Sequence, residues 1–350
     1  MEKLVSSWNN VQTVPEKYIF PPEKRPGNVT FNASKSIPVI DLEAIAISQD
    51  RDATIQKILK ASQDYGFFQV INHGVAEDLM NDTMSVFKEF FELPEEDKTS
   101  FYCEDAMRNN HCMLYTSSLL YATEDVHLWR DNLRNSCHPL EECIQHWPEK
   151  PTRYRHVVGA YATEVKKLSA TILELLCEGL GLESGHFGGK LSEIPSLLVN
   201  HYPPCPDPSL TLGVSEHCDP NLITILQQDS DVFGLQVLKN GEWIGVEPIS
   251  NAFVVNMGYQ MQIISNNKLR SVEHRAVTNS EKARTSVAMF FIPNGDSIVE
   301  PAKALVDPRN PAIYKSFQYK EFISHFMNKT GGIDVALEPF KLNIGIWHHS

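Results

Sequence analysis

The chain has 350 residues, of which 42% are hydrophobic and 21% charged, and its formal net charge is −13. A chain of this length can bury a sizeable core without disulfides, and its negative charge disfavours a nucleic-acid or anionic membrane partner. The seven cysteines include no C-x-x-C pair, and the N-terminus lacks the apolar run of a signal peptide. We therefore expect a cytoplasmic protein without a membrane span.

The first half of the chain predicts mainly helices. Residues 1–36 contain several prolines and no apolar period, which predicts an irregular arm lying over the body. Short apolar runs predict strands at 37–42 and 67–71. Helical spacing of apolar residues predicts helices near 55–66, 80–91 and 158–180. The remaining segment, 98–150, shows no clear pattern.

The character of the sequence changes after Pro195, where short β-rich runs alternate with turn signals every 8–12 residues, as in a sandwich or barrel. The sequence Lys239-Asn-Gly-Glu242 is a strong hairpin signal. A last helix is expected over 319–327. We thus expect four regions, namely an arm (1–36), a mostly helical N-terminal region (37–195), an all-β core (196–300), and a C-terminal helix with a tail (301–350).

The first candidate for chemistry is His217-Cys218-Asp219. Residues i and i+2 of a strand point to the same face, so His217 and Asp219 could bind one metal ion. A third ligand would complete a facial triad of two histidines and one carboxylate, which leaves three positions open on an octahedral iron. A His-x-acid triplet arises readily by chance. His274, which lies several predicted strands downstream, supplies the third ligand.

A second group of residues suits a small anion. Arg284 and Ser286 again share one strand face, and a guanidinium with a hydroxyl fits the carboxylate at the end of a small acid. Upstream, Asn200 and Tyr202 share a face, and the tyrosine hydroxyl could add a hydrogen bond. Three metal ligands and an anion clamp within one β-rich region are a far rarer coincidence than the triplet alone.

These motifs resemble the plant 2-oxoglutarate- and Fe(II)-dependent dioxygenases. The likeness covers nearly the whole chain and includes His217-x-Asp219, His274-Arg275, Arg284-x-Ser286, and the segments 37–42 (IPVIDL), 66–74 (GFFQVINHG), 93–98 (LPEEDK) and 200–208 (NHYPPCPDP). Within the family, the segments 147–151 (WPEKP), 177–182 (CEGLGL) and 252–256 (AFVVN) are similar to the hyoscyamine 6β-hydroxylase-like group.

The resemblance implies a mixed α and β fold, in which a helical N-terminal region packs around a double-stranded β-helix (jelly-roll) core. It implies an oxygenase that oxidises, most simply by hydroxylation, a small specialised metabolite such as an alkaloid or phenolic, with O2 consumed and succinate and CO2 released. Ascorbate would support the reaction, and the protein would be a monomer. Iron would be held by His217, Asp219 and His274, and 2-oxoglutarate by Arg284, Ser286 and Tyr202, with Asn200 beside them.

The substrate is less defined. Period 2 continues from Arg284 and Ser286 through Ala288, Phe290 and Ile292, so Phe290 and Ile292 are expected to form an apolar wall. Tyr115 is a further candidate. In the hyoscyamine hydroxylases an acidic residue is expected soon after a Leu-Tyr pair, to meet a cationic amine. Here Leu114-Tyr115 is followed by Thr-Ser-Ser, and Glu124 and Asp125 come only later. This departure argues against a tropane substrate.

One further departure from the family pattern and three alternative functions stay open. After Met257-Gly258 the family usually has an aspartate, and here Tyr259 stands instead, which affects packing rather than the triad. An oxidase of the same fold that does not consume 2-oxoglutarate shares these motifs. A vestigial ligand-binding homologue is disfavoured by the intact triad. A zinc hydrolase fits the ligand types but would leave the clamp without a purpose.

Overall fold

Two β-sheets form the centre of the molecule, as shown by the computed structural model, which describes residues 4–8, 11–29, 36–46, 48–102, 111–328 and 333–342. Residues 343–350 of the expected tail lie outside this set. The major sheet has eight strands in the order β1-β2-β10-β7-β12-β5-β4-β3, and the minor sheet has four in the order β6-β11-β8-β9. Residues of both sheets line one cavity, so the sheets face each other as in a jelly roll.

The strands of the described residues are β1 (Val39–Asp41), β2 (Phe67–Ile71), β3 (Cys112–Thr116), β4 (Asp131–Ser136), β5 (Ile194–Tyr202), β6 (Val214–His217), β7 (Ile223–Gln228), β8 (Leu235–Lys239), β9 (Glu242–Gly245), β10 (Phe253–Met257), β11 (His274–Ala276), β12 (Arg284–Ile292), β13 (Ile298–Val299) and β14 (Phe317–Gln318). The helices are α1 (Ser48–Asp64), α2 (Glu77–Glu92), α3 (Glu95–Lys98), α4 (Leu140–Cys143), α5 (Tyr154–Leu180), α6 (Tyr259–Ile264) and α7 (Tyr319–Asn328). No helix among them is both long and apolar enough to cross a membrane.

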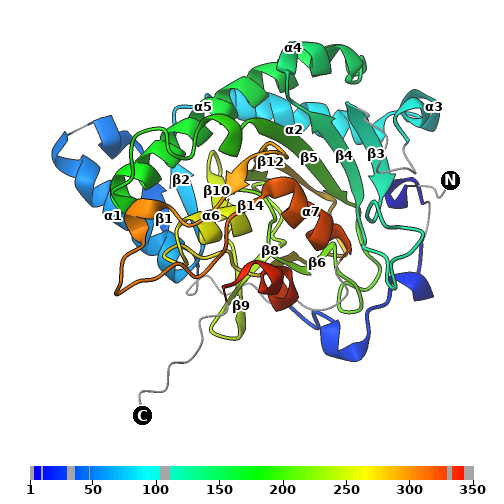
Figure 1. Cartoon of the computed structure of the whole chain (residues 1–350). Helices are drawn as coiled ribbons and strands as arrows, with labels where there is room; N and C mark the ends of the chain where they lie inside the picture. The colour runs from blue at the N-terminus through cyan, green and yellow to red at the C-terminus, as the bar shows by residue number, and fades with distance from the viewer. Residues whose placement is uncertain are drawn as a thin grey trace.

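Helices cover one face of the major sheet. The long helix α5 packs on α1 and α2, and both α2 and α5 contact β12 (Figure 1). Its apolar stripe, which includes Val158, Val165 and Leu176, is fully buried. The helix ends at Gly181, whose φ of 70° is the left-handed conformation that glycine adopts without steric cost. The opposite face of the sheet is left for the cavity.

The mixed fold with a jelly-roll core is confirmed, and so is the expected hairpin. Strands β8 and β9 pair with Lys239 opposite Glu242, and Asn240 and Gly241 between them have φ of 52° and 81°. Positive φ at both central residues is the signature of the tight turn that an Asn-Gly pair favours.

The major sheet extends beyond the segment 196–300. Strands β1 to β4 come from the N-terminal region, and β3 and β4 arise from the segment 98–150, where the sequence shows no pattern. The reason is visible in β4, where Asp131, Asn132 and Asn135 are completely buried. Buried polar residues remove the apolar alternation by which a strand is recognised.

The N-terminal arm packs on the body, with Leu4, Val5 and Tyr18 buried. The backbone N–H groups of Val5 and Ser6 donate hydrogen bonds of 2.9 and 2.8 Å to the carboxylate of Asp131. The arm therefore supplies partners for a buried acidic group at the start of β4.

Gly258 allows a close approach that any side chain would prevent. A Cβ atom at this position would lie 2.0 Å from the backbone oxygen of Asn221. We therefore expect Gly258→Ala to lower the free energy of unfolding by about 3 kcal/mol, because the loop of Asn221 must move. Urea denaturation measures this loss. Gly295→Ala is the matched control, since its nearest neighbour would be Lys320 Cβ at 3.7 Å; equal stability loss in both variants would contradict the prediction.

Candidate active site

Three side chains, two from the minor sheet and one from the loop after β6, converge inside the cavity. His217 ends β6 and His274 begins β11, and the two residues are direct partners across the strand pair. The Nε2 atoms of His217 and His274 lie 3.4 and 3.6 Å from Oδ1 of Asp219. One ligand atom from each of the three residues lies within 4.8 Å of the others. The structure thus brings together the three residues singled out in the sequence.

Asp219 reaches this point by a different route from the expected one. Strand β6 ends at His217, so strand alternation does not orient Asp219. The residue lies in the following loop, where its Oδ2 atom accepts hydrogen bonds from the Thr224 hydroxyl at 2.6 Å and the Asn256 amide at 2.8 Å. Its backbone oxygen accepts from Tyr259 N at 2.8 Å. These bonds fix the carboxylate and leave Oδ1 directed at the two imidazoles.

Both imidazoles are held in the tautomer that can bind a metal. Nδ1 of His217 lies 2.9 Å from the backbone oxygen of Ser215, and Nδ1 of His274 lies 3.1 Å from that of Val272. A carbonyl oxygen only accepts, so Nδ1 carries a proton in each ring, and Nε2, which faces Asp219, is the nitrogen available to bind a metal. Burial, and then the neighbouring His217, lower the pKa of His274 to about 4, which keeps it neutral at neutral pH.

Asp219 is almost completely buried, with 3% of its surface exposed. Burial alone raises the pKa of this carboxyl, but His274, His217 and the Thr224 hydroxyl outweigh it and hold the pKa well below its ordinary value. The site therefore offers two imidazoles and one carboxylate on one side of an open cavity. This donor set fits Fe(II), which takes such a facial triad and keeps its other positions open. Cys218 packs in the main core.

The major sheet places the expected anion clamp opposite this triad. Arg284 pairs with Tyr202 across β12 and β5, and Ser286 pairs with Asn200. The Arg284 guanidinium carbon lies 5.2 Å from the centre of the Tyr202 ring. Arg284 is 2% exposed, and its Nε atom has no partner among the described residues. A buried cation with an unsatisfied donor calls for an anion.

Sequence reasoning did not find two residues that position Arg284. The Gln228 side chain accepts a hydrogen bond of 3.0 Å from Nη2 of Arg284. Gly234 lies against the same side chain, because a Cβ there would come within 2.7 Å of Arg284 Cδ and Nε. A glutamine at the end of a strand and a glycine in a turn carry no signal for this role, since only the folded chain brings them to Arg284.

The cavity between the sheets has a volume of about 440 Å³ and is lined mainly by apolar side chains. Tyr115 and Phe290 line it, as do all the residues of the triad and the clamp, including Asn200. Ile292 does not belong to this wall; it is the last residue of β12 and packs against the main core. From α7, Phe326 and Met327 close part of the cavity.

Glu124 and Asp125, the acidic residues that follow Tyr115, are not among the described residues that line the cavity. Glu124 accepts hydrogen bonds from the hydroxyls of Ser117 and Ser118, and lies 2.7 Å from Nδ1 of His127. Asp125 is exposed to solvent. Among the described residues, no carboxylate soon after Leu114-Tyr115 reaches the cavity, where one would be expected to meet the amine of a tropane substrate. Tyr259 packs its ring on Phe322 at 6.0 Å between ring centres, which affects packing as expected.

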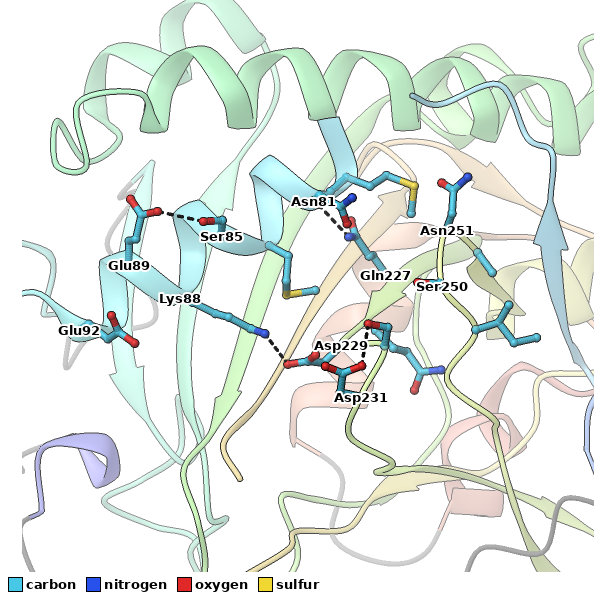
Figure 2. A pocket seen from close by; sticks show the side chains of 16 residues that line it. Asn81, Ser85, Lys88, Glu89, Glu92, Gln227, Asp229, Asp231, Ser250 and Asn251 are labelled. Carbon is cyan, nitrogen blue, oxygen red and sulfur yellow. Dashed lines mark hydrogen bonds and ion pairs between the residues drawn. The ribbon is translucent and has the colours of Figure 1, made fainter. Parts of the chain in front are cut away.

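A second cavity of about 440 Å³ lies between α2 and the segment that follows β7 (Figure 2). It is polar, and an ion pair of 2.8 Å between Lys88 and Asp229 spans it. None of the metal ligands lines it. Gln228 contributes to this wall as well as contacting Arg284.

Family models match most of the chain. Residues 194–293 match the 2OG-Fe(II) oxygenase superfamily, and residues 37–150 match the N-terminal region described as non-haem dioxygenase in morphine synthesis. Hyoscyamine 6-dioxygenase of Hyoscyamus niger is 41% identical over 98% of this chain and 100% of its own length. Flavanone 3-dioxygenase 2 of Oryza sativa subsp. japonica is 40% identical over 94% of each chain.

Solved structures agree with these matches. JOX2 in complex with 2OG, Fe and JA superposes with a TM-score of 0.84 at 33% identity, covering 97% of this chain and 98% of JOX2. The dioxygenase for auxin oxidation of rice gives a TM-score of 0.76 at 25% identity, covering 88% of this chain and all of its own. The chain belongs to the 2OG-Fe(II) oxygenase superfamily and is a 2-oxoglutarate-dependent dioxygenase.

Proposed function

We propose that His217, Asp219 and His274 hold the iron of this dioxygenase. The observation that carries the proposal is the convergence of one ligand atom from each residue within 4.8 Å, with each side chain fixed from behind by a hydrogen bond. When bound, Fe(II) supplies the oxidising chemistry, with O2 and 2-oxoglutarate consumed and succinate and CO2 released. The protein's part is to keep one face of the metal open toward the cavity.

Arg284, Ser286 and Tyr202 bind the distal carboxylate of 2-oxoglutarate in this proposal. The unsatisfied Nε of Arg284 and its low exposure support it, because the cosubstrate would supply the missing acceptor. Asn200 stands next to Ser286 on the neighbouring strand and borders the same space. The clamp and the triad belong to opposite sheets, so the cosubstrate would span the gap between them.

The organic substrate is a small metabolite with an apolar body. The side chains of Ala288 and Phe290 on β12 and Phe326 on α7 offer an apolar wall, and Tyr115 borders the opening. Such a wall excludes water and orients a ring by contact rather than by hydrogen bonds. Hydroxylation of one C–H bond that this wall presents to the metal is the proposed reaction.

The proposal includes a monomer in the cytoplasm. The six cysteines of the described residues are all free and buried, as expected in a reducing compartment. The triad, the clamp and the described lining of the cavity also all come from one chain. Light scattering on the purified protein and fractionation of the expressing tissue test these two statements.

Anaerobic titration of the Fe(II)-loaded protein with 2-oxoglutarate is the first test of the metal and cosubstrate roles. We expect a visible charge-transfer band that saturates, and that is lost in His217→Ala and in Asp219→Ala because each loses one of three ligands. Iron-dependent release of succinate should disappear with the band. Iron bound without a band would favour the oxidase that does not use 2-oxoglutarate, and full turnover by Asp219→Ala would contradict the triad.

Gln228 provides a sharper test of the clamp. We expect Gln228→Leu to weaken 2-oxoglutarate binding about tenfold, because Arg284 loses a buried hydrogen-bond acceptor. Arg284→Ala should weaken it further. The same titration measures both dissociation constants. Gln227→Leu is the matched control, since Gln227 donates to the backbone oxygen of Met80 and does not contact Arg284. Equal effects of Gln227→Leu and Gln228→Leu would contradict this arrangement.

A further inference from the structure

The cavity carries more positive than negative charge. Arg130, Arg275 and Arg284 line it, and Asp219 is the one carboxylate among its described lining residues. In the proposed function, Arg284 meets the distal carboxylate of 2-oxoglutarate. The negative charges of Asp219 and of the other carboxylate of the cosubstrate balance the positive charge of Fe(II). Two arginines therefore remain without a counterpart from the metal or the cosubstrate.

Arg275 is accounted for by the protein itself. Its guanidinium lies on the ring of Trp243 at 4.2 Å, and its Nε donates to Gln236 at 2.8 Å. The carboxylate of Glu216 also acts on it electrostatically. A stacked, hydrogen-bonded arginine with a nearby acid needs no ligand.

Arg130 is different. It directly precedes β4 and is partly buried, and it donates to the backbone oxygen of Ser117 at 3.0 Å and to Oδ1 of Asn200 at 2.8 Å. Both acceptors are neutral. Among the described residues no carboxylate forms an ion pair with it, and Glu124 is occupied by Ser117, Ser118 and His127. The two bonds fix the guanidinium and leave its other N–H groups for the cavity.

We propose that the substrate carries a carboxylate and that Arg130 binds it. A guanidinium held rigidly at two points presents a planar edge that matches a carboxylate with two parallel hydrogen bonds. The apolar body of the acid would then extend along Ala288 and Phe290 toward the metal. Arg130 is thus a specificity-determining residue that rejects the cationic amine of an alkaloid. This inference rests on the proposed function, because it takes Arg284 as occupied by 2-oxoglutarate.

The names of the relatives do not decide whether the substrate is an acid. Two relatives from Hordeum vulgare are named as dioxygenases of mugineic acid and 2'-deoxymugineic acid, at 38% and 39% identity. The relatives named for hyoscyamine and flavanone are equally similar. Overall similarity therefore does not separate an acid from a neutral or basic substrate, and the charge of the cavity has to decide.

A plant metabolite extract tests the charge of the substrate directly. The extract is separated by ion exchange into acidic, neutral and basic fractions, and each is scored for succinate release by the Fe(II)-loaded enzyme. We expect stimulation by the acidic fraction, and its loss after methyl esterification of that fraction. Stimulation by the neutral or basic fraction, or activity that survives esterification, would overturn the inference.

Variants of Arg130 tie the effect to this residue. With the active acidic fraction, Arg130→Gln should raise the apparent KM at least tenfold, and Arg130→Lys should restore part of the loss because it keeps the charge without the planar fork. The dissociation constant for 2-oxoglutarate should change less than twofold. Arg155→Gln is the matched control, since Arg155 donates to the backbone oxygen of Trp147 away from the cavity.

The visible band of the iron–2-oxoglutarate complex separates the two proposals. Loss of the band in the native enzyme would refute the proposed function. An intact band in Arg130→Gln, with an unchanged KM for the acidic substrate, would refute only the role of Arg130. A KM effect shared equally by Arg155→Gln would show a general effect on folding and would likewise overturn that role.

Discussion

The buried carboxylate of Asp219 is the interaction on which the site depends. A carboxylate removed from water is costly unless hydrogen bonds and opposite charge stabilise it. Thr224, Asn256 and the two imidazoles provide this stabilisation from several elements. Since these partners come from β6, β7, β10 and β11, the carboxylate also ties the two sheets together near the metal position. A bound divalent cation would add positive charge that His274, which is neutral at neutral pH, does not supply.

The two sheets divide the work of binding. In the proposed function, the minor sheet and the loop after β6 supply the metal ligands, and β5 and β12 of the major sheet supply the clamp. The clamp depends on neighbours with no chemistry of their own, since Gln228 orients the guanidinium and Gly234 leaves the room it occupies. Strands hold the clamp and the two histidines, and hydrogen bonds from β7 and β10 hold Asp219, so the distance between metal and clamp is set mainly by sheet packing.

The sequence predicts much of this arrangement, because the spacing of two residues on one strand shows whether their side chains lie on the same face. Arg284 with Ser286 and Asn200 with Tyr202 share a face as expected. Spacing misled at two places. Asp219 lies beyond the end of its strand, and Ile292 lies beyond the end of the cavity wall. The roles of Arg130 and Gln228 depend on tertiary contacts between β4, β5, β7 and β12, which no local pattern records.

The elements that meet the substrate are separate from those that meet the metal. The far part of β12, helix α7 and the segment between β3 and β4 line the substrate end of the cavity. Side chains there can change without disturbing the triad or the clamp, and relatives of similar identity are named for hyoscyamine, flavanone and 2'-deoxymugineic acid. In this chain, Glu124 of the segment between β3 and β4 accepts hydrogen bonds from serine hydroxyls, whereas Arg130 of the same segment lines the cavity. The proposed selection of substrate by charge is therefore local to this one segment, whereas the oxidation depends on the metal and cosubstrate sites held by the two sheets.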